Sequence, residues 1–165
     1  KSRACEFEDT KASVLGDFVP AKLGMDEGEN ALYMAVTPDY EGYLLFFFEN
    51  GKVAKVNLNA YATKTNRRKL MKAYSIKEKL SAILCIREDC RILVSASNGR
   101  VLLLNTAMIP AKATKDNQGV PVMKLTKGAT VVCAEVYEEG SIEEEHHYIP
   151  KELPSRGDFL KMAQV

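Results

Sequence analysis

Two apolar runs, each interrupted by an asparagine–glycine pair, dominate the pattern of hydrophobic and polar positions along this chain. The first is Tyr43–Asn57, with the sequence YLLFFFENGKVAKVN, and the second is Ile92–Asn105, with the sequence ILVSASNGRVLLLN. β-Prone residues on both sides of Asn-Gly are typical of a hairpin, because both turn residues tolerate a positive φ. We therefore predict two β-hairpins, closed by two-residue type I′ turns at Asn50-Gly51 and Asn98-Gly99.

The two hairpins belong to a longer repeat with an offset of 48 residues. In each unit, a basic and polar connection follows the hairpin, and a further β-prone run closes the unit. The closing run is Leu80–Ile86 in the first unit, and Val120–Leu125 followed by Thr130–Val136 in the second. The residues that recur unchanged at this offset are Leu45, Asn50, Gly51, Val53, Asn57, Lys64, Lys79 and Cys85.

The beginning of the chain predicts the back half of an earlier unit. Lys11–Leu23 and Lys112–Leu125 share a glycine, a Val-Pro pair and a Lys-Leu pair, and Glu29–Val36 parallels Glu78–Ile86. Units of about fifty residues with three or four short strands are typical of propeller blades. We therefore predict an all-β, propeller-like fold.

The predicted organisation is about three repeats, at about 1–41, 42–90 and 91–140, and an acidic, proline-containing tail over 141–165. We expect extended backbone in this tail, with one helical turn near Phe159–Ala163. The chain begins with lysine rather than methionine, and we interpret it as a piece of a longer protein. No apolar run approaches the ~20 residues of a membrane span.

The charge is nearly balanced overall, with 23 basic and 22 acidic residues, but it is uneven along the chain. Residues 51–77 contain eight Lys or Arg and no acid, whereas residues 135–145 contain six Glu and no Lys or Arg. The basic connection Lys64–Lys72, KTNRRKLMK, could neutralise nucleic-acid phosphates without reading sequence. The candidate DNA-binding residues are Lys52, Lys55, Lys64, Arg67, Arg68, Lys69, Lys72, Arg100, Lys112, Lys115, Lys124 and Lys127.

We predict no catalytic residue, metal site or cofactor. The four cysteines form no Cys-x-x-Cys pair, and Cys85 and Cys133 match in the repeat, so we interpret the cysteines as buried, reduced thiols. His146 and His147 are the only histidines, and neighbouring residues cannot both face one site on a strand. The chain contains no glycine-rich phosphate loop.

Residues 41–74, EGYLLFFFENGKVAKVNLNAYATKTNRRKLMKAY, resemble the C-terminal domain of the A subunit of bacterial type IIA DNA topoisomerases, DNA gyrase and topoisomerase IV. The segments ASNGRVLLLN and KDNQGVPVMKL repeat the theme, and the resemblance extends to about Leu160. It implies a β-pinwheel whose blades exchange hairpins and whose basic rim bends double-stranded DNA. It also implies that cleavage and ATP hydrolysis lie elsewhere, in the remaining domains of the A subunit and in the ATPase B subunit.

Two departures from the family shape these expectations. The glutamine-arginine-glycine-lysine box of gyrase is absent, which favours a topoisomerase IV-like or divergent subunit. The chain also has fewer units than a closed disc, so we expect an open or partial disc whose free strand edges could pair with another copy.

The sequence thus predicts a non-catalytic, DNA-binding and DNA-bending domain of a cytoplasmic, nucleoid-associated bacterial enzyme. The alternative is a propeller-like protein-interaction module without nucleic-acid binding, with residues 135–145 as its recognition surface. A further hypothesis, compatible with DNA binding, is that this acidic stretch inhibits DNA binding.

Overall fold

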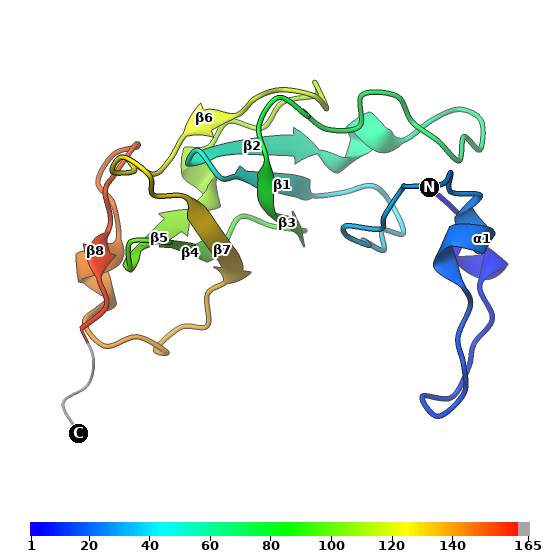
Figure 1. Ribbon diagram of the computed structural model, residues 1–165, viewed down its shortest axis with the longest axis horizontal. Coiled ribbons are helices and arrows are strands. Elements are labelled where there is room, and N and C mark those ends of the chain that lie inside the picture. Colours follow the sequence, from blue (N-terminus) through cyan, green and yellow to red (C-terminus); the bar gives the residue numbers. More distant parts are fainter. Residues whose placement is uncertain (162–165) are drawn as a thin grey trace.

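The structure, a computed structural model, describes residues 1–161. Its strands form two four-stranded antiparallel sheets, in the order β3-β1-β2-β6 and β7-β4-β5-β8 (Figure 1). The predicted all-β class is therefore confirmed. The strands are β1 (Tyr43–Phe48), β2 (Lys52–Asn57), β3 (Leu80–Ile86), β4 (Arg91–Ala96), β5 (Arg100–Asn105), β6 (Val120–Pro121), β7 (Val131–Val136) and β8 (Asp158–Phe159).

Helical structure within residues 1–161 is short. The one α-helix, α1, spans Val19–Leu23, and the 3-10 helices are η1 (Ala4–Glu6), η2 (Leu58–Tyr61), η3 (Thr106–Met108) and η4 (Glu145–Tyr148). None of these helices has the length and apolar character that crossing a membrane requires.

The two predicted hairpins are present and repeat residue for residue. Tyr43 lies opposite Asn57 in the first, and Arg91 lies opposite Asn105 in the second, 48 positions later. The same spacing of apolar residues therefore produces the same strand register in both sheets.

The predicted type I′ turns are wrong. In the first loop only Gly51 has a positive φ, 85°, and its N–H donates to the Phe48 carbonyl at 3.1 Å. This is a three-residue loop, a type I turn followed by a left-handed glycine. The Asn50 side chain stabilises it by accepting a hydrogen bond from the Lys52 N–H at 3.0 Å, so the asparagine acts through its amide rather than through a positive φ. The second loop has the same arrangement around Gly99.

The third strand of the second sheet lies three residues later than the repeat predicts. Phe47 of β1 faces Ala82, whereas the equivalent Ser95 of β4 faces Cys133. Cys85 and Cys133 are therefore not equivalent positions, and the prediction of buried thiols is wrong. Cys5 and Cys133 are exposed and Cys85 and Cys90 are half-buried, all as free thiols. Burial raises the pKa of the Cys85 and Cys90 thiols.

The fourth strand of each sheet comes from later in the chain. β6 follows β5 in sequence, yet it pairs with β2, so the chain crosses from the second sheet back to the first. Gly119 permits this crossing, because its φ is 78° and a Cβ there would lie 2.5 Å from the backbone of Val53. In the second sheet, Gly157 approaches Val101 in the same way before β8.

The predicted extended tail thus packs onto the second sheet and supplies its outer strand. Residues 141–161 supply β8, and η4 places Tyr148 in a fully buried position beside Leu103 and Val101. The helical turn expected near Phe159–Ala163 is not formed where the structure describes it, since Phe159 belongs to β8. Residues 162 and 163 lie outside the described part.

Residues 1–41, which the repeat pattern predicts to be the back half of an earlier unit, contain no strand. Val19–Leu23 forms α1, which begins with Pro20 in its first turn and ends at a left-handed Gly24. The β-prone residues 31–36 have no paired strand beside them. This segment and α1 lie at one end of the molecule, and β8 lies at the other (Figure 1).

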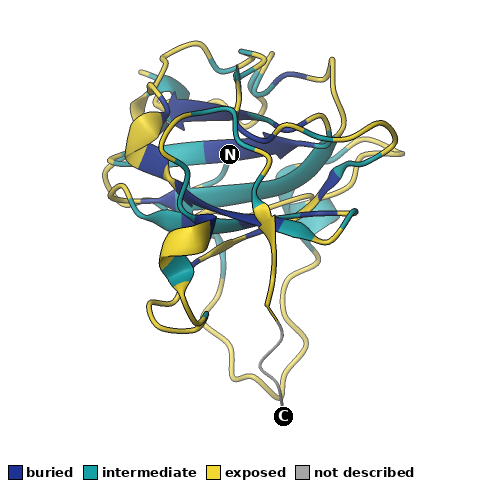
Figure 2. Cartoon of the chain, turned by 90° about the vertical axis from the view of Figure 1, so that its left-hand side faces the viewer, coloured by how far each residue is buried: buried dark blue, intermediate teal, exposed yellow. Residues whose placement is uncertain are grey.

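The largest core cluster joins the two sheets. Leu45 and Phe47 of β1 pack in one cluster with Ile92, Leu102 and Leu104 of the second sheet. Phe46 and Phe48 face the other side of β1 and form a second cluster, so both faces of this strand are buried. Figure 2 shows the buried positions concentrated in the strands and the exposed positions in the connections. The three phenylalanines are therefore core residues, not a surface for stacking on bases.

Candidate nucleic-acid interface

The crossing to β6 brings the two basic connections together. Lys112 joins the edge of β2, because its N–H donates to the Lys55 carbonyl at 2.9 Å and its carbonyl accepts from Asn57 at 3.0 Å. Three residues later, the Lys115 ammonium lies 5.8 Å from the centre of the Tyr61 ring. Tyr61 ends η2 and immediately precedes the first basic connection. The second basic connection thus runs along the edge of β2 and reaches the start of the first one at Tyr61.

The first basic connection, residues 62–72, is here called the basic loop. Its two ends are tied together by the Tyr61 hydroxyl, which donates to the Ala73 carbonyl at 2.6 Å. Burial raises the pKa of Tyr61, so this hydroxyl stays protonated and keeps its donor role at neutral pH. The loop is therefore anchored at its base, and its central cations extend into solvent.

Most of the predicted cations remain available. Nine of them have no carboxylate within ion-pairing distance among residues 1–161. We call these nine cations the basic edge; they come from the basic loop, from β2 and β5, and from the connections on both sides of β6. They are Lys52, Lys64, Arg67, Lys72, Arg100, Lys112, Lys115, Lys124 and Lys127.

Lys55 does not belong to this surface. Its side chain is 4% exposed, and its ammonium lies 2.7 Å from a carboxylate oxygen of Asp89 and 3.0 Å from the Thr106 carbonyl. The ammonium also lies 4.3 Å from the centre of the Tyr43 ring. Lys55 shares its strand face with Val53 and lies opposite Leu45, both of them core residues, and this alternation was a sequence signal for burial.

The ion pair fixes the charge of Asp89. Partial burial would raise the pKa of this carboxyl, but hydrogen bonds from Lys55 and Thr106 and the Lys55 charge outweigh it and hold the pKa below its ordinary value. Asp89 follows β3, whereas Thr106 follows β5. Lys55 thus joins the first sheet to the connections of the second, which is a structural role.

Arg68 and Lys69 of the basic loop are exposed but paired. The Arg68 guanidinium lies 3.4 Å from Glu6, and the Lys69 ammonium lies 2.8 Å from Asp26 and 3.6 Å from Glu29. All three acids come from the first 29 residues. Sequence reasoning missed these pairs because the partners lie about forty or more positions away along the chain.

At one end of the basic edge, the residues after β6 pair with the residues before β8. The Lys124 N–H donates to the Ser155 carbonyl at 2.9 Å, which brings the neighbouring, exposed Arg156 to this end. Arg100 stacks 4.4 Å from the centre of the Phe159 ring and donates to the Gly157 carbonyl at 3.1 Å. Arg156 was not among the cations predicted from the sequence. The glycine that follows it, in the same position before β8 as Gly119 before β6, was the signal that could have placed it.

The acidic residues near the C-terminal end are partly neutralised within the second sheet. Glu144 lies 2.7 Å from Lys161, and Glu145 lies 3.0 Å from Arg91. The hydrogen bond from the Tyr137 hydroxyl, with a further contribution from Arg91, holds the pKa of Glu145 below its ordinary value. In the described residues, no three His, Cys, Asp or Glu side chains converge on a metal-binding arrangement.

No family model and no curated protein matches this chain. The solved structures that resemble it include three C-terminal domains of topoisomerase subunits. The crystal structure of the C-terminal domain of DNA topoisomerase IV aligns with a TM-score of 0.66 and 22% identity over 81% of this chain. The C-terminal domain of DNA gyrase A aligns with a TM-score of 0.54 and 16% identity over 72% of it. The E. coli ParC C-terminal domain aligns with a TM-score of 0.63 and 14% identity over 93% of it.

These similarities confirm the predicted β-pinwheel fold. The chain has two interlocked sheets of the kind found in the C-terminal β-pinwheel domains of topoisomerase A subunits. It spans 42% and 43% of the topoisomerase IV and gyrase A structures, and 69% of the ParC structure.

Proposed function

We propose that this chain is part of the C-terminal domain of a bacterial type IIA topoisomerase A subunit, and that it binds and bends duplex DNA without catalysing a reaction. The observation that carries the proposal is the crossing to β6, which lines Lys112 and Lys115 up with the basic loop. The pinwheel fold shared with the topoisomerase IV and gyrase A domains supports it. The proposal includes two partners besides DNA, namely the remaining domains of the A subunit and the ATPase B subunit. It also includes a location at the bacterial nucleoid.

The mechanism is phosphate neutralisation along the basic edge. Each phosphate contact releases condensed counterions, and the logarithm of the binding constant falls with the logarithm of salt by about 0.9 per contact. The nine cations of the basic edge therefore set an upper limit of roughly 8 for this slope. Cations on a sheet edge contact the backbone rather than the base edges, so selectivity would come from DNA deformability.

The test is a salt series of binding to a duplex of about forty base pairs. The test variant combines Arg67→Gln, Lys112→Gln and Lys115→Gln, which removes cations from both sides of the crossing. The control combines Lys79→Gln, Arg87→Gln and Lys161→Gln. It removes the same charge, but each of its residues is already paired with a carboxylate.

We expect the slope of the test variant to fall by up to about 2.7, and that of the control by less than about 1. Equal losses in the two variants would show that net charge, not this edge, governs binding. A flat salt response in the wild type would contradict DNA binding itself.

The alternative is a protein-interaction module, and exposed apolar side chains favour it as the second candidate. Leu15 is 96% exposed, Phe18 74% and Met34 76%. Such side chains, clustered in a segment outside the two sheets, are typical of a protein-docking surface. Retention of the chain on DNA or heparin at moderate salt separates the two candidates.

A further inference from the structure

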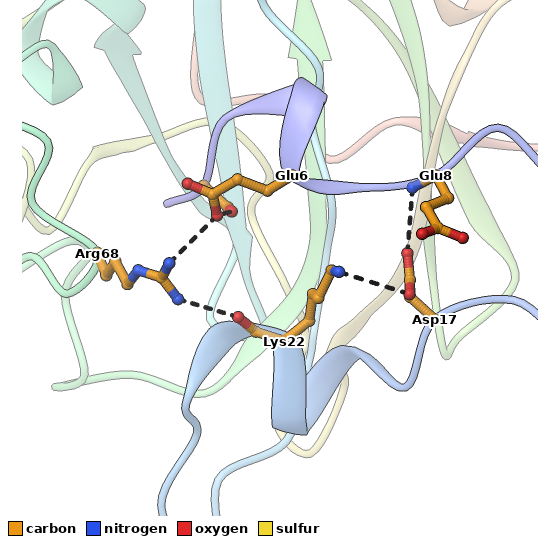
Figure 3. Close-up of polar contacts among 6 residues, drawn as sticks. Glu6, Glu8, Asp17, Lys22 and Arg68 are labelled. Atoms are coloured by element: carbon orange, nitrogen blue, oxygen red, sulfur yellow. Dashed lines mark hydrogen bonds and ion pairs between the residues drawn. The ribbon is translucent and has the colours of Figure 1, made fainter.

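The first 29 residues lie against the basic loop, and their contacts are polar. Figure 3 shows the Arg68 guanidinium between Glu6 and the carbonyl of Lys22, to which it donates at 3.1 Å. Lys69 is held between Asp26 and Glu29. Two neighbouring cations of the loop are therefore occupied by three carboxylates from one segment, while Arg67 between Lys64 and Arg68 in sequence has no such partner among the described residues.

This segment is held by polar contacts and contributes little to the core. Besides the carboxylates, the Lys1 ammonium donates to the Tyr61 carbonyl at 3.0 Å and to the Thr63 hydroxyl at 2.6 Å. Neither η1 nor α1 contains a buried residue, and residues 1–29 contribute no strand to either sheet. The carboxylates of Asp26 and Glu29 are 77% and 48% exposed, so their attraction to Lys69 is screened by water and salt. Segments with few buried contacts and exposed polar bonds open locally without unfolding the remainder.

We propose that residues 1–29 form an acidic strap that competes with DNA phosphates for Arg68 and Lys69. The inference rests on the proposed DNA binding and concerns its regulation. Arg67, Lys64 and Lys72 make the first phosphate contacts while the strap is in place. A duplex that reaches Arg68 and Lys69 replaces the three carboxylates with phosphates, and the strap leaves the loop.

The strap variant combines Glu6→Gln, Asp26→Asn and Glu29→Gln, which removes the competing carboxylates and leaves every cation in place. Its matched control combines Glu78→Gln, Glu88→Gln and Glu152→Gln, three exposed acids with no ion pair among residues 1–161. These acids lie outside residues 1–29 and outside the acidic stretch 135–145, so neither the strap nor the hypothesis of an inhibitory acidic stretch involves them. Both variants change the net charge equally, so a general charge effect appears in both.

We expect the strap variant to bind DNA roughly two- to tenfold more tightly than its control, because Arg68 and Lys69 then reach phosphates without displacing screened surface carboxylates. In a third variant, Arg68→Gln and Lys69→Gln are combined with the strap substitutions, and there the difference should vanish. A strap variant that matches its control while the wild type binds DNA would overturn the strap and leave the proposed function standing. Absence of binding in every variant would overturn the proposed function, and the strap with it.

A second measurement uses the unmodified chain. A zero-length carbodiimide reagent joins a carboxylate to an amine only when they touch, as Asp26 and Lys69 do at 2.8 Å. We expect mass spectrometry to find the Asp26–Lys69 cross-link in the free protein, and its yield to fall when DNA is added. A yield that saturating DNA leaves unchanged would show that the strap and DNA do not compete.

Discussion

The structure assigns Lys55 a structural role rather than a role in phosphate binding, and the substitution Lys55→Met tests this assignment. Methionine keeps most of the apolar stem but removes the ammonium that joins Asp89 and the Thr106 carbonyl. We expect this variant to lose stability and to keep the DNA-binding salt slope of the wild type. The matched control is Lys52→Met on the same strand, where the side chain is half-exposed and has no ion pair among the described residues.

The expected loss follows from the contacts. Removing one partner of a fully buried ion pair costs about 3–5 kcal/mol, and a hydrogen bond to a charged group contributes about 1.5–3 kcal/mol. The Asp89 side chain is 36% exposed, so water can partly replace the lost ammonium. We therefore expect the free energy of unfolding to fall by about 2–3 kcal/mol, which lowers the melting temperature by about 4–12 °C for a chain of this size.

The assay is urea unfolding followed by circular dichroism, together with the DNA salt series. The stability difference should depend on pH, because the folded-state pKa of Asp89 lies below its ordinary value of 3.8. Such a carboxylate contributes stability above its unfolded pKa and loses it as the pH falls through the folded pKa. The difference between wild type and Lys55→Met should therefore be complete at pH 7 and shrink below about pH 4.

The control variant Lys52→Met should show the opposite pattern. Its stability should change little, and its DNA-binding salt slope should be lower than that of the wild type by about 0.9. The assignment is refuted if Lys55→Met unfolds like the wild type and loses a salt-slope unit instead. That outcome would mean that the Lys55 ammonium reaches phosphate rather than Asp89.

Two further substitutions test the interlocking of the sheets. Gly119→Ala should lower the free energy of unfolding in urea by several kcal/mol, because the new Cβ would lie 2.5 Å from the Val53 backbone. Gly28→Ala is the control, because Gly28 also has a positive φ but no atom lies within 4 Å of the new Cβ. This control should lower the free energy of unfolding by only about 1–2 kcal/mol. Deleting residues 141–165 should lower the melting temperature, because it removes β8 and the buried Tyr148; tighter DNA binding at unchanged stability would instead support the hypothesis of an inhibitory acidic tail.

The local parts of this fold could be predicted from the sequence, and the long-range parts could not. The hairpin of β1 and β2 follows from a contiguous pattern around Asn50-Gly51, so its strands were found, although the turn type was not. β6 has only two residues, Val120 and Pro121, and no periodicity reveals which strand they join. Residues 31–36 have the composition of a strand, but a strand forms only where a neighbouring edge is available to pair with it.

The candidate site shows the same division. Composition identified the basic loop, and the structure adds the crossing that places Lys112 and Lys115 beside it. Counting cations could not show that Lys55 points into the core or that Glu6 reaches Arg68, because both depend on residues distant in sequence. Whether the basic edge binds DNA is a question for the salt series.

The crossing to β6 also determines when the first sheet can be completed during synthesis. β1, β2 and β3 leave the ribosome first, but the outer edge of β2 has no partner until Lys112 and then residues 120–121 have emerged. By then both strands of the second hairpin have emerged. The nascent chain therefore carries an open β2 edge while more than fifty further residues are added. Lys52 lies on that edge, opposite the later Pro121, and its charge discourages pairing with another nascent chain during this interval.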